Sequence, residues 1–270
     1  MTLITITQNF GGAGMAIASK VADELGIELF DDKKLQRLVQ ASGIPYSEIS
    51  RFDEKAPGFL DQIMSHRPHV FMDILESVIY EVARKGEGVI IGHGSQMLLR
   101  NFDCAFHVRV FLSEKKRVDN MAAQLGLSRD AALKLVRKRD KDQMGFFNFA
   151  YHLEMDEPSL YDLIIHTEKL DIDTASSLII QAARSENIRT CSLHALEAMD
   201  QLSLEKKVHA ALLKIGVDMS SIVVEVPAKG TVHVYGASVS SQETQNIETA
   251  VKGVSGVSRV VSGLVVISGV

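Results

Sequence analysis

The first two thirds of the chain alternate between short apolar runs and longer segments in which apolar residues recur every three or four positions. Short apolar runs bounded by glycine or polar residues are typical of buried strands, and the longer period is typical of amphipathic helices. The predicted strands cover residues 3–6, 26–32, 88–94, 105–113 and 161–167, and the predicted helices cover 15–25, 33–42, 69–85, 171–184 and two segments after 113, the second capped by Ser128. This order predicts an α/β domain with a parallel sheet flanked by helices.

The pattern changes at residues 185–200, which are polar, have no clean period and are predicted to be a linker. Beyond them the predicted order is helix, strand, strand, helix, strand, at 203–215, 221–227, 231–237, 240–252 and 257–267. Residues 228–230 form the predicted hairpin turn between the first two of these strands. We therefore expect two domains, an α/β domain over 1–184 and a small α+β domain over 201–270.

Composition and charge exclude several classes of function. The chain has 270 residues, is 46% hydrophobic and carries a net charge of −5, so it has no basic footprint for nucleic acid. We expect no signal peptide and no membrane span, since no apolar run approaches ~20 residues, and the near-neutral charge of residues 201–270 gives no polybasic membrane signal. Cys104 and Cys191 lie far apart in sequence and are predicted to be reduced thiols of a cytoplasmic protein.

The most informative segment is LITITQNFGGAGMAIA at residues 3–18. An apolar strand runs into a turn that contains Gly11, Gly12 and Gly14, and a helix follows. Glycine tolerates positive φ and lets a ligand approach the backbone. The helix N-terminus beneath such a turn offers free N–H groups and a positive dipole end, so the segment predicts a phosphate-binding loop.

Several segments, in order along the chain, resemble the cytidylate-kinase-like family, a branch of the P-loop nucleoside monophosphate kinases. The matching segments are ITITQNFGGAGMAIASKVADELGIELFDDKKL, DEKAPGFLD, VIIGHG, FLSEKKRV, RDKDQMGFF and YDLIIHTEKL. The resemblance covers residues 1–184 and is specific because the matches are collinear. It implies a P-loop kinase-like fold and ATP-dependent phosphoryl transfer to a nucleoside monophosphate, with ATP and Mg²⁺ as cofactors of an active enzyme.

The resemblance also implies roles for individual residues. The nucleotide-binding set is Gly11, Gly12, Ala13, Gly14 and Arg117; the lid set with catalytic roles is Arg137, Arg139 and Asp140; the substrate-binding set is Asp31, Asp53 and His93. No resident metal site is implied by these residues. Each set has a structural alternative: the glycine turn as a vestigial turn kept only for packing, Arg117 as a solvated arginine, Asp31 and Asp32 as the N-cap and first turn of a helix, His93 as a structural histidine, and 137–142 as a solvated helix face.

The chain departs from the family pattern where that pattern has cations or a hydroxyl. Those positions hold Met15, Ala16, Asp32, His93 and Gln143. A working phosphate loop needs a lysine or arginine on the phosphates and a hydroxyl on Mg²⁺. Two hypotheses remain open, a kinase with a degenerate loop and a catalytically inactive nucleotide sensor or interaction scaffold. A dinucleotide-binding fold is a weaker third, because Ile17 breaks the glycine fingerprint.

The C-terminal 70 residues resemble a BON domain. The segments that carry this resemblance are KGTVHVYGASV at 229–239 and VKGVSGVSRVVSGLVV at 251–266. BON domains are described as interaction modules. The resemblance therefore implies that this domain contacts a protein partner or a second copy of the chain.

Overall fold

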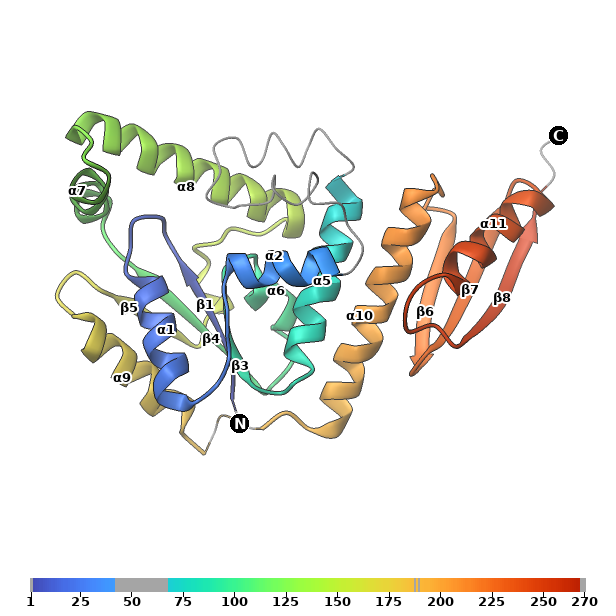
Figure 1. Cartoon of the computed structure of the whole chain (residues 1–270), viewed down its shortest axis with the longest axis horizontal. Helices are drawn as coiled ribbons and strands as arrows, with labels where there is room; N and C mark the ends of the chain where they lie inside the picture. The colour runs from blue at the N-terminus through green and yellow to red at the C-terminus, as the bar shows by residue number, and fades with distance from the viewer. Residues whose placement is uncertain (1, 42–67, 187, 189, 268–270) are drawn as a thin grey trace. The chain divides into compact units, whose positions relative to one another are not determined.

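The computed structural model describes residues 2–41, 68–186, 188 and 190–267, and the chain within them divides into two compact units (Figure 1). The first unit contains residues 1–64 and 85–192. The second contains residues 65–84 and 193–270. The described residues 68–84 thus group with the C-terminal part of the chain, whereas the sequence pattern places them in the N-terminal domain.

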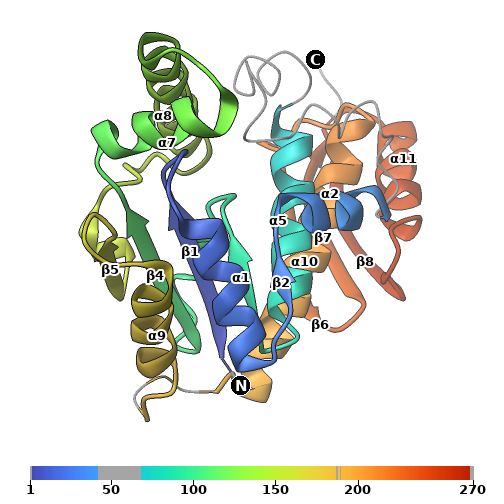
Figure 2. The ribbon, with the colours of Figure 1, turned by 60° about the vertical axis from the view of Figure 1, so that its left-hand side comes forward.

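The first unit is built on a five-stranded parallel sheet in the order β2-β3-β1-β4-β5 (Figure 2). The strands are β1 (Leu3–Gln8), β2 (Leu29–Phe30), β3 (Gly88–Ile91), β4 (Ala105–Phe111) and β5 (Leu163–His166). The helices are α1 (Gly14–Leu25), α2 (Asp32–Ala41), α6 (Ser95–Leu99), α7 (Glu114–Leu125), α8 (Arg129–Tyr151) and α9 (Ile172–Ala183), and a 3₁₀ turn, η1, spans Pro158–Leu160. The predicted α/β class is confirmed, and Ser128 caps α8 as predicted.

The core of this unit lies between one face of the sheet and the helices α1 and α9, which pack side by side (Figure 2). Strand residues and helix stripes interdigitate there, and their side chains include Ile4, Ile6, Ile17, Val21, Val108, Val110 and Ile179. Parallel strands covered by helices read as continuous apolar runs, which explains why β1, β3 and β4 were visible in the sequence.

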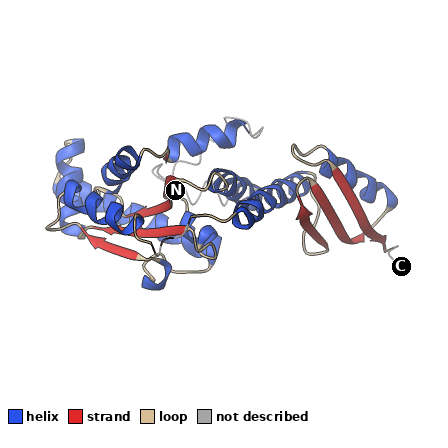
Figure 3. Cartoon of the chain, turned by 90° about the horizontal axis from the view of Figure 1, so that it is seen from below, coloured by secondary structure: helices blue, strands red, loops and turns tan. Residues whose placement is uncertain are grey.

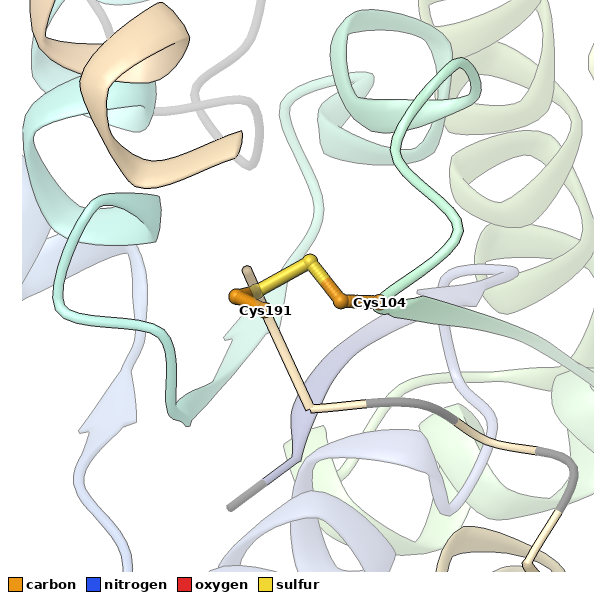
Figure 4. The surroundings of a disulfide bond; sticks show 2 residues. All are labelled: Cys104 and Cys191. Atoms are coloured by element: carbon orange, nitrogen blue, oxygen red, sulfur yellow. A yellow bond between two sulfur atoms is a disulfide. The ribbon is translucent and has the colours of Figure 1, made fainter. Parts of the chain in front are cut away.

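A disulfide joins Cys104, just before β4, to Cys191, near the end of the first unit (Figure 4). The two Cα atoms lie 4.8 Å apart, although 87 residues separate the cysteines in sequence. The prediction of two reduced thiols is therefore wrong, because sequence separation says nothing about which segments the fold brings together. The argument from free thiols for a cytoplasmic location no longer holds.

The second unit combines two long helices with a small mixed sheet (Figure 3). Its elements are α5 (Pro68–Ala83), α10 (Leu193–Lys214), β6 (Ile222–Ala228), β7 (Thr231–Ser238), α11 (Ser241–Lys252) and β8 (Arg259–Val266). Strand β7 pairs antiparallel with β6 and parallel with β8. The predicted α+β arrangement is confirmed, with a buried cluster of valines, leucines and isoleucines between the sheet and α10 and α11.

Helix α10 starts at Leu193, so the predicted linker at 185–200 is wrong for its second half. The segment contains strong helix formers, and it lacks a clean period because α10 packs against both α5 and β6. Met199 of this segment is fully buried. Lys206 of α10 links to α5 by ion pairs of 3.5 Å to Asp73 and 2.8 Å to Glu76.

Candidate functional site

The glycine turn connects β1 to α1 in the manner of a phosphate-binding loop. Gly11 has a φ of +83°, and the N–H of Gly12 donates to the carbonyl of Asn9 over 3.2 Å. Ala13 occupies the N-cap position of α1, and no side chain caps this helix. The first backbone N–H groups of α1 therefore have no side-chain cap, which suits an anion. The N–H of Gly12 is taken up by Asn9, and phosphate binding by Gly11, Gly12, Ala13 and Gly14 stays a prediction.

Gly14 is required at its position by its neighbour on β1. A Cβ atom added there would lie 2.5 Å from Oε1 of Gln8 and 2.7 Å from its Cβ. Gln8 in turn accepts a hydrogen bond at its backbone carbonyl from Nε2 of Gln143 on α8, over 3.0 Å. Gln143 therefore fastens α8 to the end of β1 at a position where the family pattern has an arginine.

A cavity of about 310 Å³ opens beside the turn, at the carboxyl ends of β1 and β3. Ligands of open α/β sheets bind at this edge. The lining residues come from the glycine turn, β3 and the helices α1, α2, α7 and α8, and they are Gln8, Phe10, Gly11, Gly12, Met15, Asp32, Ile91, Gly92, Met121, Gln124, Leu125, Arg139 and Gln143. Gln8 and Gln124 are lining residues that the sequence analysis missed, because an uncharged amide gives no motif.

Two charged side chains stand in this lining within the described part of the chain. Arg139 of α8 lies with its guanidinium carbon 5.4 Å from the centroid of the Phe10 ring, and Asp32 begins α2. Met15, which the family resemblance predicts to stand where other members have a cation, also lines the cavity. The charges on this wall are thus the guanidinium of Arg139 and the carboxylate of Asp32, and Met15 adds an apolar thioether.

Asp32 and His93, two of the positions that depart from the family pattern, lie together. Nε2 of His93 is 2.9 Å from Oδ1 of Asp32, and the His93 side chain is 3% exposed. His93 has a φ of +56° between two glycines, and its carbonyl accepts a hydrogen bond of 3.2 Å from the hydroxyl of Tyr151. The sequence marks both residues as departures from the family pattern, but nothing in it indicates that they contact each other.

Asp31 takes the structural role that the sequence analysis gave as its alternative. Its carboxylate accepts a hydrogen bond of 2.9 Å from the backbone N–H of Lys34, in the first turn of α2. This is the geometry of a helix N-cap. Asp53, the remaining residue of the predicted substrate-binding set, lies outside the described residues.

Arg117 is a buried anchor between the turn and α8. Its guanidinium donates to the carbonyls of Phe10 and Leu112 over 3.1 and 3.0 Å and makes two bonds of 2.8 Å to the carboxylate of Asp140. Neither Arg117 nor Asp140 lines the cavity. Both residues therefore position the loop through their hydrogen bonds and do not line the cavity.

Arg137 faces away from the cavity. It makes two hydrogen bonds of 3.0 Å to Glu114 of α7, both side chains are largely exposed, and the bond raises the pKa of Arg137. The three lid candidates are thus separated: Arg139 enters the cavity, Asp140 holds Arg117, and Arg137 forms a surface pair. The solvated-face alternative holds for Arg137.

Arg109, Asn9 and Asp156 form a hydrogen-bonded group next to the turn that the sequence does not predict. Arg109 of β4 is 3% exposed and donates to Asn9 over 3.1 Å and to Asp156 over 2.6 Å. It also lies 6.0 Å from the ring centroid of Tyr161, whose pKa is raised mainly by burial. An arginine is unusual in a buried strand, and this is the feature of the sequence that could have indicated a role for Arg109. It holds the first residue of the turn from the sheet side.

The parallel sheet, its strand order and the glycine turn before α1 define a P-loop kinase-like domain. Residues 3–169 match the cytidylate kinase-like family, and the chain belongs to that family. It is 25% identical over 177 residues to the cytidylate kinase of Pyrobaculum islandicum, which covers 65% of the chain and 89% of the relative. It is 23% identical over 188 residues to that of Archaeoglobus fulgidus, 69% and 97% of the two chains.

A solved structure has the same fold. An uncharacterized protein from Eubacterium ventriosum matches with a TM-score of 0.53 at 21% identity, over 67% of this chain and 97% of that one. None of the helices described here is long and apolar enough to cross a membrane.

Proposed function

We propose that this protein binds a nucleotide, with its phosphates on the glycine turn, and has lost most of the phosphoryl-transfer activity of its family. The observation that carries the proposal is Met15. This thioether lines the cavity at the position of the family cation, next to Ala16, which has no hydroxyl for Mg²⁺. Backbone donors can still hold a phosphate, but the charge clamp on the transferred group is reduced to Arg139.

The acceptor is proposed to be a cytidine nucleotide, because the relatives are named cytidylate kinases, and ATP is proposed as the donor because the family resemblance implies it. The fit to ATP is partial. The turn supplies N–H groups, and Arg139 supplies one cation. Mg²⁺ held by the nucleotide's own phosphates has no hydroxyl partner at Ala16, so the metal would lose one of its usual protein ligands.

Calorimetric titration of the full chain with ATP, CMP and CTP, each with and without Mg²⁺, tests binding. A coupled assay over all nucleoside monophosphates then tests turnover. Binding without turnover is the expected pair of results. Absence of binding by every nucleotide would refute the proposal, and turnover at ordinary kinase rates would refute its second half.

The second candidate is an active nucleoside monophosphate kinase in which Arg139 alone stabilises the transferred phosphoryl group. The position of Arg139 in the cavity favours it. In that case Arg139→Gln abolishes turnover and Arg137→Gln, a surface variant on the same helix, leaves it unchanged. Equal turnover in both variants would exclude this role for Arg139.

For the second unit we propose a role as a BON-like interaction module. The support is the resemblance of residues 229–239 and 251–266, together with the α-β-β-α-β order of the elements from α10 to β8. Cross-linking of the full chain followed by mass spectrometry tests it. Intermolecular cross-links at residues 222–266 are expected, and cross-links confined to the first unit would count against it.

A further inference from the structure

We propose that β8 is the pairing edge through which two copies of this chain associate, joining their small sheets into one six-stranded sheet. The proposal rests on the interaction role just given to the second unit, and it names the partner. Strand β8 is the last strand in the order β6-β7-β8, and in the described residues nothing pairs with its other side.

The free side of β8 carries a regular row of backbone groups. The N–H groups of Arg259 and Ile267 donate to the carbonyls of Gly230 and Ser238, which fixes the register with β7. In a parallel ladder, alternate residues direct both polar groups to the same neighbour. The residues that direct their N–H and C=O groups away from β7 are therefore Val260, Ser262, Leu264 and Val266.

The chemistry of this edge favours pairing. From residue 260 to residue 267 the strand has no charged side chain and no proline, and Val265 and Ile267 are 64% and 60% exposed. Proteins usually protect a free edge of this length with lysine, proline or a bulge. The opposite edge has such protection, since β6 contains Glu225 and Pro227, and its register with β7 shifts between Glu225 and Ala228.

The residues of β8 favour a second copy of the same strand as its partner. Two copies of β8 can lie antiparallel about a two-fold axis at Ser262, so that Ser262 of one copy lies opposite Ser262 of the other and Gly263 lies opposite Val261. The small side chains impose no crowding there. No like charges meet within 260–267, and the apolar outer-face residues Val261 and Val265 of the two copies become diagonal neighbours across the junction. Because the face is neutral, it offers no complement to a strongly acidic or basic peptide.

The test is the oligomeric state of the full chain as a function of concentration, by sedimentation equilibrium. We compare the wild type with Ser262→Lys, which places two lysines opposite each other near the axis, and with Ser262→Pro, which removes one outward N–H. The matched control is Val223→Lys on β6, where the valine is 54% exposed at the other edge. Circular dichroism verifies that every variant is folded.

A dimer in the wild type and in Val223→Lys, with the dissociation constant raised about tenfold or more in both Ser262 variants, is the expected result. A wild type that stays monomeric at every concentration overturns the proposal. A dimer that persists in Ser262→Lys also overturns it, but leaves the broader interaction role of the second unit standing. If only Val223→Lys dissociates, the pairing edge is β6 and the proposal is wrong.

Discussion

Arg117 makes two hydrogen bonds of 2.8 Å to Asp140, and through this pair the glycine turn is fastened to helix α8. The same guanidinium donates to the carbonyl of Phe10, inside the turn. A buried cation between two segments is stable only with its carboxylate, because an unpaired charge there has lost its hydration without compensation. The pair therefore holds the loop and Arg139, one residue before Asp140, in a fixed relation.

Replacement of Asp140 by alanine should lower the free energy of unfolding by about 3 kcal/mol, because it leaves Arg117 buried without its carboxylate. Denaturant unfolding of the full chain measures this change. The control is Arg137→Ala, which breaks an exposed pair on the same helix and should leave the unfolding midpoint unchanged. Similar losses in both variants would show that Asp140 has no special anchoring role.

Reduction of the Cys104–Cys191 disulfide should lower the free energy of unfolding by about 2–5 kcal/mol, because the bond closes a long loop in the unfolded chain. Thermal unfolding with and without dithiothreitol measures the effect, and a thiol titration of the unreduced protein should find no free cysteine. The double variant Cys104→Ser with Cys191→Ser should not respond to dithiothreitol. A wild type that is equally insensitive would contradict the prediction.

Replacement of Met15 by lysine, together with Ala16→Thr, should strengthen ATP binding about tenfold or more. The lysine adds a charge-assisted bond to a phosphate, which is worth about 1.5–3 kcal/mol, and the threonine supplies the missing hydroxyl. Calorimetry with Mg-ATP measures the change. Met15→Leu with Ala16 retained is the matched control and should bind like the wild type. Unchanged affinity in the lysine variant would mean that phosphates do not reach this part of the turn.

The stability of the second unit should fall on mild acidification through His209. Burial, with a smaller contribution from the Lys206 charge, lowers the pKa of His209 from 6.5 to about 4. Between these values the unfolded chain binds a proton that the folded chain does not. His209 therefore leaves the free energy of unfolding unaffected above pH 6.5, where it is neutral in both states. As the pH falls from 6.5 towards 4, it lowers the free energy of unfolding by about 1.4 kcal/mol per pH unit.

Unfolding profiles between pH 7.5 and 4.5 test this, with His209→Gln compared with the wild type. The variant should lose less stability on acidification. His194→Gln, at an exposed histidine of the same helix, should follow the wild-type profile. Asp73 acts in the opposite direction, because burial raises its pKa to about 6, but it is common to all three proteins. Parallel profiles for the wild type and His209→Gln would contradict the assignment.

The strands and helices of the first unit could be read from the sequence because each depends on local period and caps. Apolar runs marked β1, β3 and β4, and Ser128 marked the start of α8. The glycine turn could also be predicted, since glycine is favoured at the positive φ of Gly11 and Gly14 has no room for a Cβ atom beside Gln8. The arrangement of the predicted substrate-binding residues could not be predicted from the sequence, because it depends on which loops the fold brings together.

What the sequence alone determined is therefore the α/β class, the cytidylate kinase-like family and the glycine turn between β1 and α1, all of which are properties of contiguous segments. Tertiary structure decided the rest. It paired Cys104 with Cys191, His93 with Asp32 and Arg117 with Asp140, and it grouped α5 with the C-terminal unit. These contacts join residues far apart in the chain, and packing, not local preference, chooses the partners.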